Sequence, residues 1–173
     1  MRSLREYQIN FVGLSLGTHR FEFEVGDAFF EHFNNDELRD VKIQLEVELE
    51  KKSNMLQLQF THRGTATVSC DRCLEDMTIP LHQVNLLIVK FGDADYAEQT
   101  DDIVVISPNE YQIDISQFVY EYILVDVPLG HSHEPSECNP EVLKALEKYA
   151  VGQQNNEPEE DPRWAPLKKN KNE

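Results

Sequence analysis

One stretch of the sequence decides the fold, namely Val41-Lys42-Ile43-Gln44-Leu45-Glu46-Val47-Glu48-Leu49-Glu50-Lys51-Lys52-Ser53-Asn54-Met55-Leu56-Gln57-Leu58-Gln59-Phe60. Apolar and polar residues alternate from Val41 to Glu50, and this period of two is typical of a β-strand with one apolar face. Residues 51–54 have the composition of a turn, and residues 56–60 repeat the alternation on a second strand. The stretch therefore predicts an antiparallel hairpin with one solvated face.

Strands extend outward from this hairpin in both directions. Further strands are predicted over residues 7–11, 21–25, 66–70, 79–91 and 103–106. Residues 79–91 are apolar on both faces near Leu86-Leu87-Ile88-Val89, which predicts a central strand that is covered on both sides. Residues 92–102 hold five acidic residues and no basic ones, so we expect a solvated, mobile loop there.

Helices are predicted at three places. Apolar residues recur at helical spacing between Ile115 and Ile123, which indicates an amphipathic helix that begins near Asp114 and ends before Pro128. A short helix is expected after Asp27, and Asn139-Pro140-Glu141 predicts the start of another that ends near residue 149. The fold class is therefore α+β, with a curved antiparallel, barrel-like sheet and one or two covering helices.

The chain is expected to form one domain over residues 1–151, followed by a disordered tail over residues 152–173. The tail is first acidic and then basic, and it contains the element Asp161-Pro162-Arg163-Trp164. Trp and Arg are frequent anchors at binding interfaces, so Asp161, Pro162, Arg163 and Trp164 are candidate binding residues. The alternative is that Trp164 folds back onto its own domain.

The composition narrows the class of partner. The 173 residues carry a formal net charge of -16, which opposes broad binding to the phosphates of a nucleic acid and suits a basic protein partner. Solubility alone is the alternative reason for such a charge. No secretory signal and no membrane-spanning stretch is present, and three cysteines make a poor disulfide framework. We expect a cytoplasmic protein with reduced thiols and no contact with a membrane.

Cys70-Asp71-Arg72-Cys73 has the spacing of half a metal site. Cys70, Cys73, His131 and Cys138 would complete a tetrahedral set for one structural Zn²⁺ if the fold joins them, and His133 lies beside His131. In the alternative, Cys70 packs inward and Cys73 shapes a turn. Arg72 is a candidate contact for a phosphate or carboxylate, or a surface arginine.

Motifs that would indicate catalysis are missing from the sequence. There is no Ser-His-Asp order, no P-loop and no dinucleotide-binding glycine pattern. A redox role for the two cysteines would need a thioredoxin-like context, which the predicted strands do not provide. We therefore expect no enzymatic activity and name no catalytic residue.

Two stretches together resemble the YceD family, also called the large ribosomal RNA subunit accumulation protein family and long catalogued as a domain of unknown function. One is Val68-Ser69-Cys70-Asp71-Arg72-Cys73-Leu74-Glu75, and the other is Asp161-Pro162-Arg163-Trp164-Ala165-Pro166-Leu167. The layout between them is also similar, with Ile113-Asp114-Ile115, the helix to Val127-Pro128-Leu129, and then His131 and Cys138. The resemblance covers nearly the whole chain.

The resemblance implies a ribosome biogenesis factor that supports synthesis, processing or stability of large-subunit (23S) ribosomal RNA. It supplies no catalytic residues, and extra cysteines in some members suggest a metal. The acidic charge makes a precursor of the large ribosomal subunit, or a basic ribosomal protein, the expected partner, with ribosomal RNA met indirectly. Two alternatives stay open, namely a direct RNA-binding or RNA-processing protein and a small structural zinc-binding adaptor.

Overall fold

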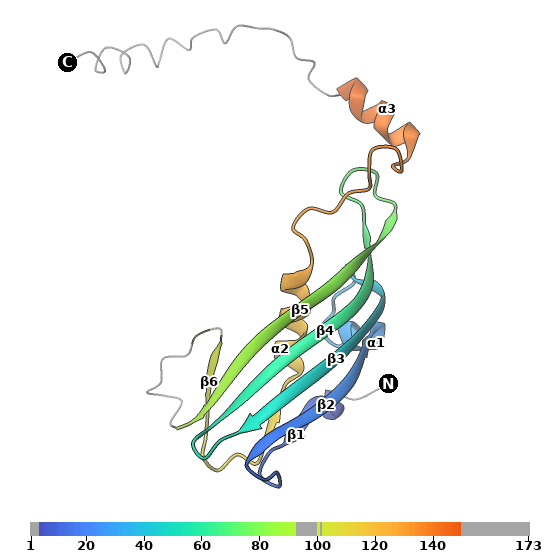
Figure 1. Ribbon diagram of the computed structural model, residues 1–173. Coiled ribbons are helices and arrows are strands. Elements are labelled where there is room, and N and C mark those ends of the chain that lie inside the picture. Colours follow the sequence, from blue (N-terminus) through green and yellow to red (C-terminus); the bar gives the residue numbers. More distant parts are fainter. Residues whose placement is uncertain (1–3, 93–99, 101, 150–173) are drawn as a thin grey trace, which may run out of the picture. The chain divides into compact units, whose positions relative to one another are not determined.

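The computed structural model describes residues 4–92, 100 and 102–149, and they form a mixed α+β fold (Figure 1). The chain divides into two compact units, Met1–Cys138 and Asn139–Glu173. The first unit contains a 3₁₀ turn over Leu4–Tyr7 and helices α1 (Asp27–Glu31) and α2 (Ser116–Asp126). Its strands are β1 (Gln8–Asn10), β2 (Gly17–Gly26), β3 (Arg39–Lys51), β4 (Met55–Ser69), β5 (Asp76–Phe91), β6 (Ile103–Ile106) and β7 (Gln112–Asp114).

The predicted hairpin is confirmed, and it forms the centre of the main sheet. Strands β3 and β4 pair antiparallel, with Val47 opposite Phe60 and Leu49 opposite Leu58. All four of these side chains are fully buried. Because neighbouring residues of a strand point to opposite faces, a slip of one residue by either strand would turn the buried side chains of that strand to the solvated face.

The main sheet has the strand order β2-β3-β4-β5-β6 and is open. Strands β2 to β5 are antiparallel neighbours, but β6 runs parallel to β5, with Ile88 beside Ile103 and Phe91 beside Ile106. The prediction of a wholly antiparallel, barrel-like sheet is therefore wrong. A barrel requires its first and last strands to pair, whereas β2 and β6 are the two edges in the part of the chain described, and β1 pairs with β7 in a separate sheet.

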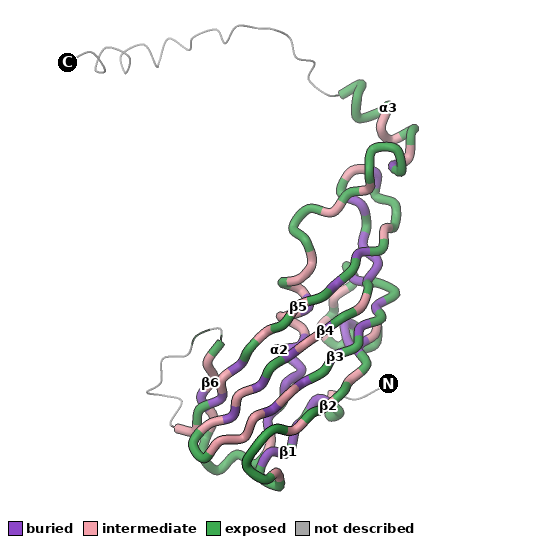
Figure 2. The backbone as a smooth tube through the Cα atoms, viewed as in Figure 1, coloured by how far each residue is buried: buried purple, intermediate pink, exposed green. Residues whose placement is uncertain are grey.

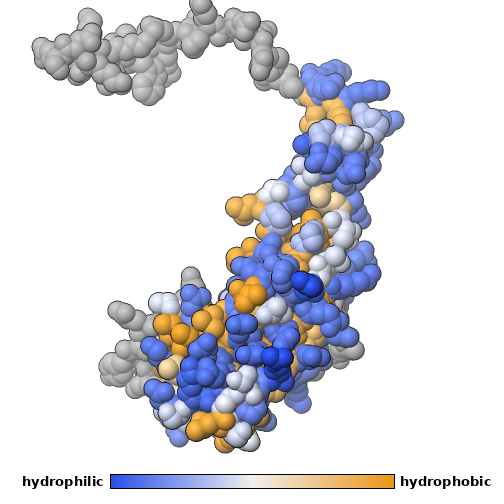
Figure 3. Space-filling model, in the orientation of Figure 1, coloured by the Kyte–Doolittle hydropathy of each residue, from blue (hydrophilic) through white to orange (hydrophobic). Residues whose placement is uncertain are grey.

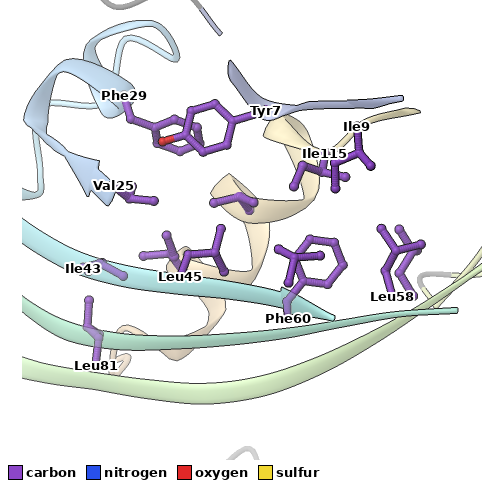
Figure 4. Packing of buried hydrophobic residues seen from close by; sticks show 14 of the residues in the cluster. Tyr7, Ile9, Val25, Phe29, Ile43, Leu45, Leu58, Phe60, Leu81 and Ile115 are labelled. Carbon is purple, nitrogen blue, oxygen red and sulfur yellow. The ribbon is translucent and has the colours of Figure 1, made fainter. Parts of the chain in front are cut away.

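Helix α2 lies against one face of the main sheet, as Figure 1 shows. Its predicted amphipathic character is confirmed, because Ile115, Val119 and Ile123 are buried in the core. Figure 4 shows the core as two facing layers of apolar side chains. Labelled members include Tyr7, Ile9, Phe29 and Ile115 in one layer, and Leu45, Leu58 and Phe60 in the other.

The other face of the main sheet is exposed and mostly polar. Figure 2 shows buried and exposed residues alternating along the central strands, as expected for a sheet covered on one side. Strand β5 follows this rule, since Leu87 and Val89 are fully buried while Leu86 is 41% exposed and Val84 is 54% exposed. The predicted coverage of β5 on both sides is therefore wrong.

A contact between a buried histidine and a carboxylate joins the end of α2 to the sheet. The imidazole of His62 on β4 is 1% exposed, and its Nε2 lies 3.0 Å from a carboxylate oxygen of Asp126, the last residue of α2. This contact holds the last turn of α2 against the sheet. The segment after α2 therefore starts from a fixed point beside the inner face of β4.

The second unit begins at Asn139 and, in its described part, consists of helix α3 (Pro140–Tyr149). The predicted start is confirmed, because the side-chain carbonyl of Asn139 accepts a hydrogen bond from the Glu141 N–H at 2.9 Å. The predicted tail over residues 152–173 lies outside the described residues, and a single domain over residues 1–151 stays a prediction. No helix of the described residues is both long enough and apolar enough to cross a bilayer.

Candidate metal centre

The turn between β4 and β5 forms the first half of the site. The Cys70 N–H donates to the Glu75 carbonyl at 2.8 Å, and the Leu74 N–H donates to the Cys70 carbonyl at 2.9 Å. Leu74 adopts a left-handed backbone conformation with φ 62°, which lets the turn close within these few residues. Cys70 and Cys73 are both buried, so the turn directs two thiols inward.

The segment after α2 supplies the second half and is bonded to that turn. The Asp71 N–H donates to the His131 carbonyl at 2.9 Å, and the His131 N–H donates to a carboxylate oxygen of Asp71 at 2.7 Å. Further along, the Cys138 N–H donates to the Glu134 carbonyl at 3.3 Å, which turns the chain back towards the cysteines. The two halves therefore meet although they are about sixty residues apart in sequence.

Four side chains from these halves form a compact cluster, namely Cys70, Cys73, His133 and Cys138. One ligand atom from each lies within 4.8 Å of those of the other three. The Sγ atoms of Cys70 and Cys138 are 4.0 Å apart, and Cys73 Sγ lies 3.4 Å from His133 Nδ1. No disulfide joins the three cysteines.

The sulfur–sulfur separation of 4.0 Å and the sulfur–nitrogen separation of 3.4 Å are close to those around a tetrahedral metal ion. With Zn–S bonds of about 2.3 Å and a Zn–N bond of about 2.0 Å, tetrahedral angles place two sulfurs about 3.8 Å apart and a sulfur and a nitrogen about 3.5 Å apart. Three thiols and one imidazole are also a donor set that selects zinc or a related soft ion over calcium or magnesium. The cluster can therefore hold a metal ion through four protein ligands.

The thiol of Cys70 is prepared for ionisation by the backbone around it. Burial opposes ionisation, but N–H groups of Cys73, His133 and Arg72, helped by the Cys73 side chain, outweigh it and lower the pKa of Cys70 to about 6. The N–H groups of Arg72 and His133 each lie 3.4 Å from Cys70 Sγ. The same bonds would stabilise a metal-bound thiolate, because they donate to a negatively charged sulfur.

The pKa values of His133 and Cys138 shift in the opposite direction. The hydrogen bond with Cys73 raises the pKa of His133, although burial of the imidazole lowers it. The negative charges of the Cys70 and Cys73 thiolates raise this pKa further. Burial, followed by hydrogen bonds with the other two cysteines, raises the pKa of Cys138. Protons and a metal ion therefore compete for the same atoms in this cluster.

A family model described as large ribosomal RNA subunit accumulation protein YceD matches residues 58–170. The chain belongs to the YceD family. The match includes the whole cysteine and histidine cluster as well as strands β5 to β7 and helix α2. No curated protein and no solved structure matches the chain. The family description names an accumulation protein for ribosomal RNA and names no reaction.

Of the four predicted metal ligands, His131 alone lies outside the observed cluster of three cysteines and one histidine. Its Nδ1 lies 3.1 Å from the Pro128 carbonyl oxygen, and its Nε2 lies 3.7 Å from a carboxylate oxygen of Asp71. His133 stands in the cluster instead. His131 and His133 are two positions apart, and residues i and i+2 of an extended segment point to the same side, so sequence spacing could not choose between them.

Arg72 is engaged with the cluster. Its Nη1 lies 3.8 Å from Cys138 Sγ and 3.3 Å from the carbonyl oxygen of His133. A divalent ion held by three thiolates and a neutral imidazole would leave one net negative charge, which the guanidinium would offset. Contact of Arg72 with a phosphate or carboxylate stays a prediction, and the predicted binding residues Asp161, Pro162, Arg163 and Trp164 lie outside the described residues.

Proposed function

We propose that the protein is a non-enzymatic ribosome biogenesis factor. It supports synthesis, processing or stability of large-subunit (23S) ribosomal RNA, and it acts in the cytoplasm through protein contacts with the precursor of the large subunit. The observation that carries this proposal is the family match over residues 58–170, whose description concerns accumulation of that RNA.

The charges favour a protein partner over naked RNA. Each phosphate contact needs a basic group, but the net charge is -16 and residues 92–130 contain neither Lys nor Arg. Several arginines of the first unit are already engaged, with Arg20 paired to Glu48 and Arg39 to Asp76. Ribosomal proteins are mostly basic, so a complementary field would speed their association with this protein.

We further propose that the cluster of Cys70, Cys73, His133 and Cys138 holds one structural Zn²⁺. Four protein ligands close the coordination shell, as in structural zinc sites, and leave no position for a substrate. The ion would connect the turn after β4 to the segment after α2. Its contribution is stability and shape, which agrees with a factor that binds and does not catalyse.

The test has two arms at physiological salt. The first measures binding of the purified protein to naked large-subunit RNA, and the second measures its co-sedimentation with large-subunit precursors. We expect co-sedimentation without tight RNA binding, and a fall of large-subunit RNA relative to small-subunit RNA in a deletion strain. Tight, salt-sensitive binding to naked RNA would overturn the protein-contact proposal and favour a direct RNA-binding protein.

The remaining outcomes separate the other proposals. Absence from precursors together with normal RNA ratios would contradict a role in ribosome biogenesis, and bound zinc in such a protein would favour a small structural zinc-binding adaptor.

Asp161, Pro162, Arg163 and Trp164 remain proposed contacts with the partner. Replacing Trp164 with Ala should weaken co-sedimentation, while replacing the nearby Leu167 should have a smaller effect, because large aromatic residues dominate binding interfaces.

A further inference from the structure

A groove of about 510 Å³ lies beside the proposed metal centre, between the end of β4 and the segment after α2. The base of the groove is apolar and contains the buried side chains of Leu38 and Val68. Leu124 and Val127 also line the groove and make one of its walls apolar. A volume of this size accommodates several side chains of a ligand. The groove is therefore large enough to receive a short stretch of another chain.

One wall of the groove holds an apolar side chain that is open to solvent. Leu129 has a relative exposure of 107%, the largest among the exposed hydrophobic residues of the described chain. Figure 3 shows hydrophobic surface along the segment that leaves α2. Single exposed leucines are common on proteins, but this one borders a groove whose base is also apolar.

The rim of the groove is acidic. Glu37 and Asp71 line it, and no Lys or Arg is among its lining residues. Two arginines lie near the groove along the chain. Arg39 is bonded to Asp76 and to the hydroxyl of Ser69, so its charge is already compensated. Arg72 follows Asp71, and its guanidinium contacts Cys138 and the His133 carbonyl. An apolar base with an acidic rim complements a ligand that is apolar at its centre and positive at its ends.

We propose that this groove binds a short segment of a basic protein, in which an aliphatic or aromatic side chain is flanked by Lys or Arg. This inference rests on the proposed function and specifies which surface meets the basic partner. The apolar side chain would lie against Val68, Val127 and Leu129, and the flanking cations would lie near Glu37 and Asp71. Burial of the apolar anchor supplies affinity, and the charges supply orientation and a faster association.

The groove also depends on the metal centre. Two of its lining residues, Asp71 and His131, form the reciprocal hydrogen bonds that join the two halves of the proposed zinc site. Release of the ion would loosen the segment that carries Leu129. We therefore expect a chelator to weaken binding in the groove without changing the charges on its rim.

The test uses an array of overlapping peptides, each roughly 15 residues long, that covers all large-subunit ribosomal proteins. The full-length protein should select basic peptides with an apolar anchor, and fluorescence anisotropy should then give their Kd in solution. Leu129→Ser should weaken the selected peptides by about tenfold or more. Glu37→Gln should weaken them a few-fold and reduce the salt dependence. Leu16→Ser and Glu110→Gln replace exposed residues that do not line the groove and should leave Kd unchanged.

Three results of the peptide and RNA binding experiments would overturn the inference. The first is an array without selective binding, and the second is binding that the Leu129 and Glu37 variants do not change. The third is binding of naked RNA that Leu129→Ser weakens, which would assign the groove to RNA. Co-sedimentation separates this inference from the proposed function. If wild-type protein and Leu129→Ser associate equally with precursors, the groove assignment fails and the proposed function stands. If wild-type protein does not associate, the proposed function itself fails.

Discussion

The sheet core and the cysteine cluster are both buried parts of the first unit, but different contacts hold them. The core is a continuous set of apolar side chains that joins β1 to β5 with α1 and α2. Cys70, Cys73 and Cys138 are as buried as that core but are not part of it. Around them, the chain is held by hydrogen bonds between the Asp71 turn and the segment near His131.

This difference indicates where each region obtains its stability. The core is stabilised by removal of apolar surface from water, which needs no cofactor. The cysteine cluster lies outside that apolar core, and its thiols and imidazole would be stabilised by sharing an ion. The two regions should therefore respond to different perturbations, and the measurements that follow test that separation and then each region by itself.

The largest effect should come from the core. Phe60→Ala would leave a cavity beside Tyr122, whose ring centroid lies 5.2 Å away, and should lower the free energy of unfolding by about 3–5 kcal/mol. Urea denaturation measures this change. The zinc content of the folded variant should equal that of the wild type. Loss of zinc together with stability would show that the core and the metal centre are not separate.

Metal removal should give the next largest effect. If free zinc stands about 100–1,000-fold above its Kd, a strong chelator should remove about 3–4 kcal/mol of apparent stability. Hydrogen exchange should locate the loss, with faster exchange in residues 70–75 and 127–138 and retained protection in the pairs of β3 with β4. A uniform increase in exchange would contradict a local role for the ion.

Much of the core was predictable from sequence, because a period of two or 3.6 residues reports directly which side of a strand or helix is buried. The β3–β4 hairpin and helix α2 follow this rule. The direction of β6 was not predictable, because Ile103-Val104-Val105-Ile106 has the same pattern in a parallel and an antiparallel pair. For the same reason, the pattern along each strand did not tell an open sheet from a closed barrel.

The cysteines of the cluster could be predicted from the sequence, but the histidine that completes it could not. The two-residue spacing of Cys70 and Cys73 identified one half of the site, and Cys138 was a reasonable third member. Which histidine completes the cluster depends on the hydrogen bonds between the Asp71 turn and the segment after α2, and those form only in the fold. The contact of Arg72 with Cys138 is likewise a tertiary feature.

A matched pair of variants tests that membership. His133→Ala should weaken zinc binding by roughly 100-fold or more, because it removes a ligand, whereas His131→Ala should have a much smaller effect. Competition with a chromogenic chelator gives both affinities under the same conditions. The reverse order of effects would assign the ligand to His131 and contradict the observed cluster.

The smallest effect concerns the core at alkaline pH. Burial, followed by the charges of Asp102 and Glu121, raises the pKa of Tyr122 to about 12 from an ordinary value of 10.0. The folded protein therefore keeps this proton after the unfolded chain has lost it, so its contribution is fully present below pH 10 and is lost as the pH rises towards 12. Urea midpoints should fall less steeply with pH in Tyr122→Phe. Identical slopes would contradict the raised pKa.

The most direct test of the metal centre is the metal content and coordination of the protein as purified, without added metal. Elemental analysis should find about one zinc per chain, and X-ray absorption should report three sulfur ligands and one nitrogen ligand. Cys138→Ser should remove a sulfur from that shell or empty the site. Metal-free wild-type protein whose melting temperature does not change with zinc or with a chelator would contradict a metal centre at Cys70, Cys73, His133 and Cys138.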